Sequence, residues 1–263
     1  MAYEQKVYRF GESNEIECSY MGNYGAKGEK RAPRKKATKE QIAKQNQWNR
    51  EKSVRRLIKA NFHPWDLWCT LKYPAGTTKP PEEAKKDLSK ALDKLRRAYK
   101  KEGVPFKFIY RMEIGERGGI HIHILVNRLY GCKVNTDILI QKAWNTGLVF
   151  FESLYEQGGY AALAAYIVKK PKTEEIKGQL SLFPEEERKK LLSISTSRNL
   201  IRPQPERKKY SHWTMRRILQ EGPKPTPGYY IDEDSIYSGV NPYTGMSYLH
   251  YTEVRIRQGD GRG

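Results

Sequence analysis

Hydrophobic and polar residues alternate along two neighbouring stretches in the middle of the chain. Apolar residues take the even positions from 106 to 114 and again from 120 to 126. Because successive side chains of a strand point to opposite faces, this period of two predicts strands at 105–114 and 120–127, joined by a short loop. The even positions of both strands must then share one buried face, and the odd positions share the other.

Other stretches combine a clear period with a start or stop signal. Residues 66–73 are rich in β-forming side chains and end before Pro74, which predicts a strand. Pro80 and Pro81, followed by two glutamates, open a helix, because proline fits the first turn and carboxylates favour its positive end. Further along, the pattern predicts a helix at 136–145, a strand at 148–154 and a helix at 160–170.

The order of these elements predicts an α+β fold. Strand, helix, two strands, helix and strand is the order of the ferredoxin-like or RRM-like arrangement, for which we expect a central antiparallel sheet with helices packed on one face. Thr38 and Gln41 form a capping box at the start of a lysine-rich and arginine-rich helix. We therefore divide the chain into a basic flexible arm (1–37), a basic helix (38–62), a compact domain (63–205) and a C-terminal extension or tail (206–263).

The charge of the chain indicates its class of partner. The formal net charge is +19 over 263 residues, which favours an anionic polymer, since clustered lysines and arginines bind phosphates by releasing condensed counterions. The three cysteines are widely separated, without a metal-finger spacing, and are expected to be reduced thiols. We find neither a signal peptide nor a long apolar stretch, so we expect a cytoplasmic protein without a membrane partner.

The odd positions of the predicted hairpin carry a candidate metal site. His121 and His123 lie two residues apart and share a face, and the register that pairs the even positions places Glu113 directly across from His121. Two imidazoles and one carboxylate leave coordination positions open, which is typical of a catalytic rather than a structural metal. Glu116, in the loop, is the rival third ligand. The alternative interpretation is two ordinary surface histidines.

A candidate nucleophile follows on the predicted helix at 160–170. Tyr166 and Lys169 are three residues apart and would share a helical face. Tyr160 is six residues before Tyr166 and lands well away around the helix, so it is geometrically poor as a partner. The alternative interpretation of this pair is a tyrosine at the edge of the core beside surface lysines.

In this order, the His-x-His pair and the Tyr-x-x-Lys helix resemble the HUH endonucleases, and among them the rolling-circle replication initiators, or Rep proteins, of phages and plasmids. The strand Leu67-Trp68-Cys69-Thr70-Leu71-Lys72-Tyr73 is similar to the first Rep motif. Asn61-Phe62 and Ser197-Arg198-Asn199-Leu200 are similar to sequences of the phage replication-protein branch. The resemblance covers roughly residues 40–205 and identifies the compact domain with an HUH catalytic domain.

The resemblance implies a site-specific nicking and joining enzyme. Glu113, His121 and His123 would hold one divalent metal ion, Mn²⁺ or Mg²⁺, and Tyr166 would attack a phosphate of single-stranded DNA at a replication origin, leaving a 5′-phosphotyrosine and a free 3′-OH. Lys169 would neutralise charge on the phosphate or hold the phenolate. Lys170-Pro171 follows where many relatives carry a second tyrosine, which favours single-tyrosine chemistry. A host helicase or polymerase is a further candidate partner.

Three other interpretations compete with this one. The first is a different HUH enzyme, a transposase or a relaxase. The second is a metal-dependent nuclease that uses water and forms no covalent link, and the third is a non-catalytic nucleic-acid-binding module of the same fold. In all of them, exposed aromatic residues are candidates to stack on unpaired bases, namely Trp65, Trp68, Trp213 and the C-terminal tyrosines.

Overall fold

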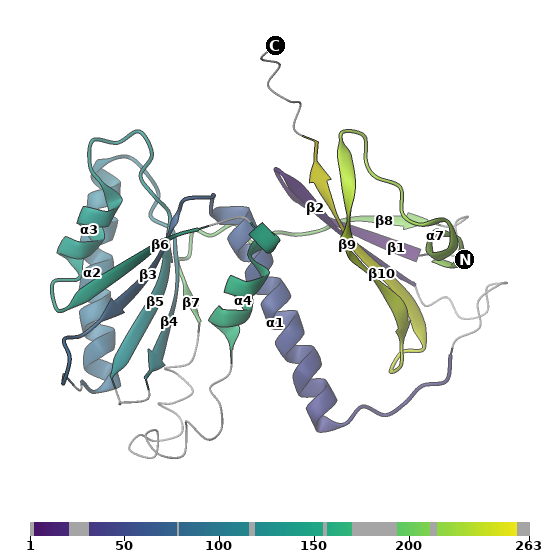
Figure 1. Cartoon of the computed structure of the whole chain (residues 1–263), viewed down its shortest axis with the longest axis horizontal. Helices are drawn as coiled ribbons and strands as arrows, with labels where there is room; N and C mark the ends of the chain where they lie inside the picture. The colour runs from purple at the N-terminus through teal and green to yellow at the C-terminus, as the bar shows by residue number, and fades with distance from the viewer. Residues whose placement is uncertain are drawn as a thin grey trace, which may run out of the picture. The chain divides into compact units, whose positions relative to one another are not determined.

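The computed structural model describes residues 3–20, 32–77, 79–115, 119–154, 157–169, 194–210 and 215–256. The chain divides into two compact units, one of residues 46–202 and one of residues 1–45 and 203–263, and each is described by itself (Figure 1). The charged loop expected at 172–190 lies outside the described residues. Among the helices that are described, none is long and apolar enough to cross a membrane.

The unit of residues 46–202 is built on a five-stranded antiparallel sheet with strand order β6-β3-β5-β4-β7. β4 follows β3 in the chain but lies beyond β5, and β6 follows β5 but lies beyond β3, so the two crossovers are split as in a ferredoxin-like fold. The predicted α+β class with a central antiparallel sheet is confirmed. Its elements are β3 (Leu67–Lys72), α2 (Pro81–Lys101), β4 (Phe108–Ile114), β5 (Ile120–Val126), α3 (Thr136–Ala143), β6 (Leu148–Ser153), η1 (Gln157–Tyr160), α4 (Ala161–Val168) and β7 (Ser195–Thr196).

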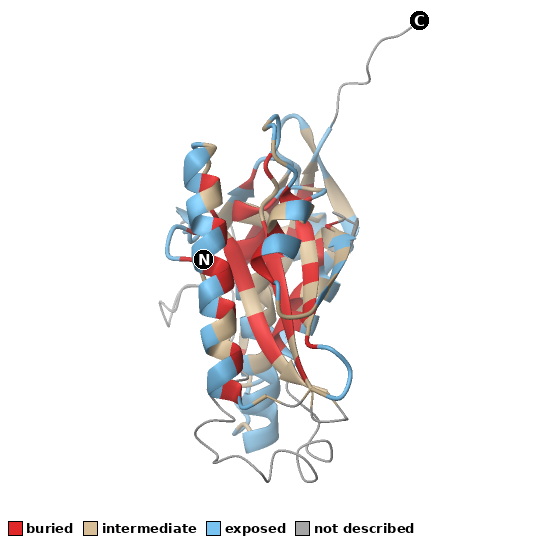
Figure 2. Cartoon of the chain, turned by 90° about the vertical axis from the view of Figure 1, so that its left-hand side faces the viewer, coloured by how far each residue is buried: buried red, intermediate tan, exposed pale blue. Residues whose placement is uncertain are grey.

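The register of β4 against β5 is the one that the alternation predicts. Glu113 pairs with His121, and Arg111 pairs with His123. The even positions, Met112 and Ile122 among them, are buried in one core together with the apolar stripe of α2. Figure 2 shows this division, with buried residues along the strands and exposed residues on the outer sides of the helices. Alternation and helical period therefore agree on a single buried face.

Helices cover the second face of the sheet as well, which corrects the expectation of helices on one face only. α2 and α3 lie on one side, and α1 (Lys39–Asn61) and α4 lie on the other (Figure 1). Ile109 and Leu125, at odd positions, are buried with Ile58 of α1 and Ile167 of α4 in a second core. Apolar residues at the odd positions of β4 and β5 are the reason: an exposed face would not carry them.

The second unit corrects the expected arm and tail. Residues Tyr3–Phe10 (β1) and Ser13–Tyr20 (β2) form a hairpin, and the C-terminal segment adds three strands and a helix to it. These are β8 (Glu206–Tyr210), α7 (Met215–Glu221), β9 (Tyr229–Asn241) and β10 (Met246–Arg255), in the sheet order β8-β1-β2-β10-β9. A small core that includes Ile16, Cys18 and Leu249 lies on one face of this sheet. Charged residues interrupt the alternation of these strands, so no hydrophobic period is evident in the sequence.

The basic helix begins as predicted. The Thr38 backbone N–H donates to the Gln41 side chain at 2.9 Å, and the Gln41 backbone N–H donates to the Thr38 hydroxyl at 3.2 Å, which is a complete capping box. The helix ends at Asn61. This residue belongs to one of the two short motifs that resemble phage replication proteins.

The two phage-like motifs hold the fold together. The buried Asn61 amide donates to the carbonyls of Leu57 (2.9 Å) and Ile201 (2.7 Å), and its oxygen accepts from the Ile201 N–H at 2.7 Å. Ser197 exchanges hydrogen bonds with the Phe108 backbone, while the Asn199 amide donates to the Phe106 carbonyl. Together these bonds tie the segment after β7 to α1 and to the start of β4.

Replacing Asn61 with leucine should destabilise the protein by about 2–4 kcal/mol, because both backbone groups of Ile201 would lose a buried partner. The midpoint of urea unfolding measures the loss. Asn46→Leu, at an exposed position of the same helix, is the control and should change the midpoint little. Equal stability of Asn61→Leu and wild type would contradict this role for Asn61.

Candidate functional site

Three polar side chains meet on the odd-numbered face of β4 and β5. The Tyr166 hydroxyl of α4 lies 3.0 Å from Nε2 of His123 and 3.3 Å from Oε2 of Glu113, to which it donates. His123 Nε2 and Glu113 Oε2 are 3.2 Å apart. A phenol, an imidazole and a carboxylate, from residues far apart in the chain, therefore share one set of hydrogen bonds.

Packing of α4 aims Tyr166 at this point. Ala164, Ile167 and Val168 are buried against the second core, so the neighbouring Tyr166 is carried to the edge of that core. Its side chain is 39% exposed, which leaves the hydroxyl accessible from solvent. The site is thus an open face bordered by a packed helix.

The His123 ring is fixed by its neighbours on β3. Thr70 Oγ1 lies 3.1 Å from Nδ1, and the Trp68 ring stacks on the imidazole with centroids 5.7 Å apart and planes 10° apart. The ring is buried, and its Nε2 faces Tyr166 and Glu113. A threonine hydroxyl can donate or accept, so Thr70 accommodates either tautomer of the imidazole.

Arg111 attaches the end of α4 to the sheet. Its buried guanidinium donates to the carbonyls of Tyr166 (3.0 Å) and Ile167 (3.1 Å), which belong to the last turn of the helix and lack partners within it. A cation at this end also favours the helix dipole. Arg111 therefore holds the backbone that carries Tyr166.

The electrostatics of the site separate the three titratable types. The hydrogen bond with His123 lowers the pKa of Glu113 to about 2, and the Arg111 charge acts in the same direction. Burial, and then the charge of Lys72, lower the pKa of His121. Burial and the nearby Glu113 raise the pKa of Tyr166 to about 12. Near neutral pH the carboxylate is ionised, the His121 imidazole is neutral and the phenol is protonated.

His121 lies beside the cluster, between Lys72 of β3 and Glu113 of β4 in the sheet register. Its ring packs against Gly115: a Cβ built on this glycine would lie 3.1 Å from Cε1 of His121. A side chain at position 115 would therefore press on the imidazole. Glycine is the residue that leaves room for it.

The donor types suit a divalent cation, although the residues described here do not include a group of three His, Cys, Asp or Glu side chains gathered as a metal site requires. Glu113 is deprotonated and His121 neutral, as metal ligands must be. Thr70, bonded to Nδ1 of His123, is a typical outer partner that orients a ligating imidazole. In the structure, however, Glu113 and His123 contact each other and Tyr166.

Other predicted site residues lie outside this cluster. α4 ends at Val168, so the helical face that Tyr166 was predicted to share with Lys169 stops there, and the exposed Lys169 is the C-cap. Tyr160 is 5% exposed and packs in the second core. Glu116, the rival ligand, lies outside the described residues. So does Trp213, whereas Trp65 is 58% exposed.

The roles of Thr70 and Arg111 were not predicted from the sequence. Thr70 pairs with His123, and Lys72 with His121, in the register of β3 against β5. The alternation of buried Leu67, Cys69 and Leu71 with residues 68, 70 and 72 carries this signal, because it assigns the latter three to the histidine face. Arg111 was already placed opposite His123, but nothing in the sequence indicates that α4 ends above it.

Comparison with known families supports the same part of the chain. Residues 66–171 match a family model of replication-associated proteins, the one described as "Replication-associated protein" of the ORF2 type. This segment is similar to replication initiators of the Rep type. It covers less than half of the chain and contains Glu113, His121, His123 and Tyr166. Searches of the curated proteins and of the solved structures found no match for the chain.

Substituting Arg111 should loosen the end of α4. Arg111→Leu leaves two helix carbonyls without partners, and we expect a loss of about 2–3 kcal/mol of stability, with faster hydrogen exchange in α4 than in α2. Arg111→Lys, which keeps the charge but loses the planar fork, should lie between this variant and wild type.

The control for this comparison is Arg97→Leu, at an exposed position of α2. It should leave both stability and exchange near the wild-type values. Unchanged exchange of α4 in Arg111→Leu would contradict the attachment of the helix by Arg111.

Proposed function

We propose that the chain is a rolling-circle replication initiator that nicks and rejoins single-stranded origin DNA through a covalent tyrosine intermediate. The match to replication-associated proteins supports a Rep-type initiator that acts on DNA. The net charge of +19 suits a DNA partner. The resemblance of the His-x-His and Tyr-x-x-Lys motifs to HUH endonucleases supplies the reaction class.

One observation carries the proposal: the hydroxyl of Tyr166 lies 3.0 Å from His123 and 3.3 Å from Glu113. A nucleophile within hydrogen-bond reach of a base, which is itself oriented by a third group, is the arrangement expected for covalent catalysis. Here Thr70 and Trp68 orient His123. An accidental surface histidine would not need such support.

In the proposed step, the Tyr166 oxygen attacks the scissile phosphorus. A bond forms between phosphorus and the phenolic oxygen as the bond to the 3′ oxygen breaks, and the 3′ oxygen leaves with a proton as a free 3′-OH. The phenolic proton passes to an acceptor at the site, where His123 Nε2 and Glu113 Oε2 lie within reach. Because one phosphodiester is exchanged for another, the reverse reaction can rejoin the strand at termination.

A divalent ion, Mn²⁺ or Mg²⁺, would complete the site, with Glu113, His121 and His123 as the residues that hold it. When bound, it would polarise the phosphate and offset the negative charge of Glu113, which keeps Tyr166 protonated. Lys169, on the exposed end of α4, is placed to approach a phosphate from the solvent side. Thr70 would orient His123 as a ligand.

The high pKa of Tyr166 favours a second candidate, a metal-dependent nuclease that uses water. A phenol with a pKa near 12 is a weak nucleophile at neutral pH unless its surroundings change on binding. The two reactions leave different products, because only the first produces protein covalently joined to DNA.

Replacing Tyr166 with phenylalanine should abolish the covalent adduct. We expect wild type to form a denaturation-resistant complex with labelled single-stranded origin DNA in the presence of Mn²⁺, and Tyr166→Phe to lower its rate more than about 1000-fold. Tyr160→Phe, in the same peptide, is the control and should keep the activity. An adduct that persists in Tyr166→Phe, or cleavage without any adduct, would overturn this mechanism.

Removing the metal should stop the reaction. A chelator should abolish adduct formation, and added Mn²⁺ or Mg²⁺ should restore it; His121→Ala and His123→Ala should require far more metal or fail to respond. Thr70→Val should lower the apparent metal affinity by about 10- to 100-fold, because it removes the partner of His123 Nδ1. Full-rate cleavage in chelator, or by His121→Ala, would contradict the metal assignment.

A further inference from the structure

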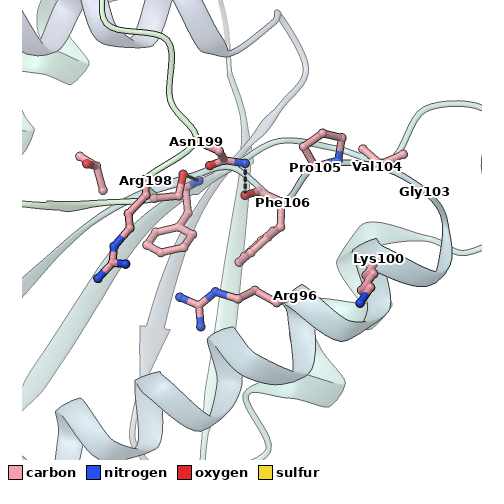
Figure 3. A pocket seen from close by; sticks show the side chains of 11 residues that line it. Arg96, Lys100, Gly103, Val104, Pro105, Phe106, Arg198 and Asn199 are labelled. Atoms are coloured by element: carbon pink, nitrogen blue, oxygen red, sulfur yellow. Dashed lines mark hydrogen bonds between the residues drawn. The ribbon is translucent and has the colours of Figure 1, made fainter.

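A cavity of about 760 Å³ opens at the edge of the sheet, between α2 and the segment that follows β7. Arg96 and Lys100 line it from the helix, Phe106 and Phe108 from the start of β4, and Arg198 and Asn199 from the segment after β7. Figure 3 shows Arg96 and Arg198 approaching the same space from the two sides. None of these residues belongs to the Tyr166 cluster.

The polar lining of the cavity is cationic. Arg96, Lys100 and Arg198 are all exposed, and within the described part of the chain only Arg96 has a carboxylate partner, Asp93. Arg96 keeps further N–H donors, because a guanidinium has five. Three positive groups around one opening favour a phosphate-bearing ligand.

The remaining lining is apolar and suits more than an inorganic anion. The rings of Phe106 and Phe108 lie 5.3 Å apart, and the Arg96 guanidinium lies over the Phe108 ring at 5.7 Å. Val104 and Pro105 extend the apolar surface. A chain that alternates phosphates with apolar sugar and base surfaces would satisfy both kinds of lining.

The site is rigid on the side of Arg198. Ser197 and Asn199, its two neighbours, hydrogen-bond to the backbone of Phe108 and Phe106 respectively. Arg96 and Lys100 are one turn apart on a helix whose apolar stripe is buried. Two fixed elements therefore hold the cations in place before a ligand binds, which reduces the entropy lost on binding.

The cavity lies on the α2 side of the sheet, because Phe106 and Phe108 are even positions, whereas Glu113, His121 and His123 are odd. Five residues of β4 separate Phe108 from Glu113, which is about 17 Å along the strand. β7, at this edge, is only two residues long. A flexible strand leaving the Tyr166 site could thus pass around the edge of β4 to reach the cavity.

We propose that this cavity binds the backbone of single-stranded DNA outside the scissile phosphate, with phosphates against Arg96, Lys100 and Arg198 and the apolar parts of a nucleotide against Phe106, Val104 and Pro105. The identity of the ligand rests on the proposed function. The site lengthens the grip on the substrate strand beyond the catalytic cluster.

The salt dependence of binding tests this assignment without any cleavage. Affinity for a labelled single-stranded oligonucleotide of about 30 nucleotides is measured in chelator by fluorescence anisotropy over a range of salt, for wild type and for the triple variant Arg96→Gln, Lys100→Gln, Arg198→Gln. Losing three phosphate contacts should lower the slope of log K against log salt by about 2. The triple control Lys86→Gln, Lys90→Gln, Lys142→Gln removes the same charge at exposed positions elsewhere and should change the slope by much less.

Each outcome decides the question. Equal slopes for the two triple variants would assign the effect to overall charge and overturn the site, as would an unchanged slope in the cavity variant. An equal effect on duplex DNA of the same sequence would overturn the single-strand assignment. If the triple variant unfolds, Arg198→Gln alone should lower the slope by about 0.7. Failure of Tyr166 to form an adduct would leave these binding results unaffected, so the two proposals fail separately.

Discussion

Glu113 faces His121, and Arg111 faces His123, because β4 and β5 pair in one register and no other. A slip by one residue would bury the histidines and Glu113 and turn Ile122 and Met112 outward. Cores on both faces of the sheet oppose such a slip: Met112 and Ile122 pack on one side, and Ile109 and Leu125 pack on the other. The candidate site depends on this pairing before any chemistry is considered.

The register also explains why one helix can complete the site. α4 packs on the same face as the histidines, and Arg111 binds the carbonyls of its last turn. That bond and the buried Ile167 together place the Tyr166 hydroxyl against His123 and Glu113. The carboxylate raises the pKa of the phenol, so the same contact that positions the nucleophile keeps it protonated until positive charge arrives.

The strands and helices of the α+β unit, and the pairing of Glu113 with His121, follow from residues whose periods are clean. The second helical layer did not follow, because the expectation of a polar odd face overlooked Ile109 and Leu125, which are buried there. The outer sheet, where an arm and a tail were expected, has charged residues among its strands and pairs strands from opposite ends of the chain, as in β1 with β8. Such pairing depends on tertiary contacts that a local period does not encode. The end of α4 at Val168, which separates Lys169 from Tyr166, is likewise set by packing.

The central claim is that Tyr166, and no other tyrosine, becomes joined to DNA. Trypsin would leave residues 143–169 as one peptide, which contains Tyr155, Tyr160 and Tyr166. Fragmentation of the nucleotide-bearing peptide by tandem mass spectrometry, after reaction with single-stranded origin DNA and Mn²⁺ and digestion of the DNA, locates the added phosphate. The account predicts the phosphate on Tyr166. A phosphate on Tyr160 or Tyr155, or cleaved DNA with no modified peptide, would contradict it.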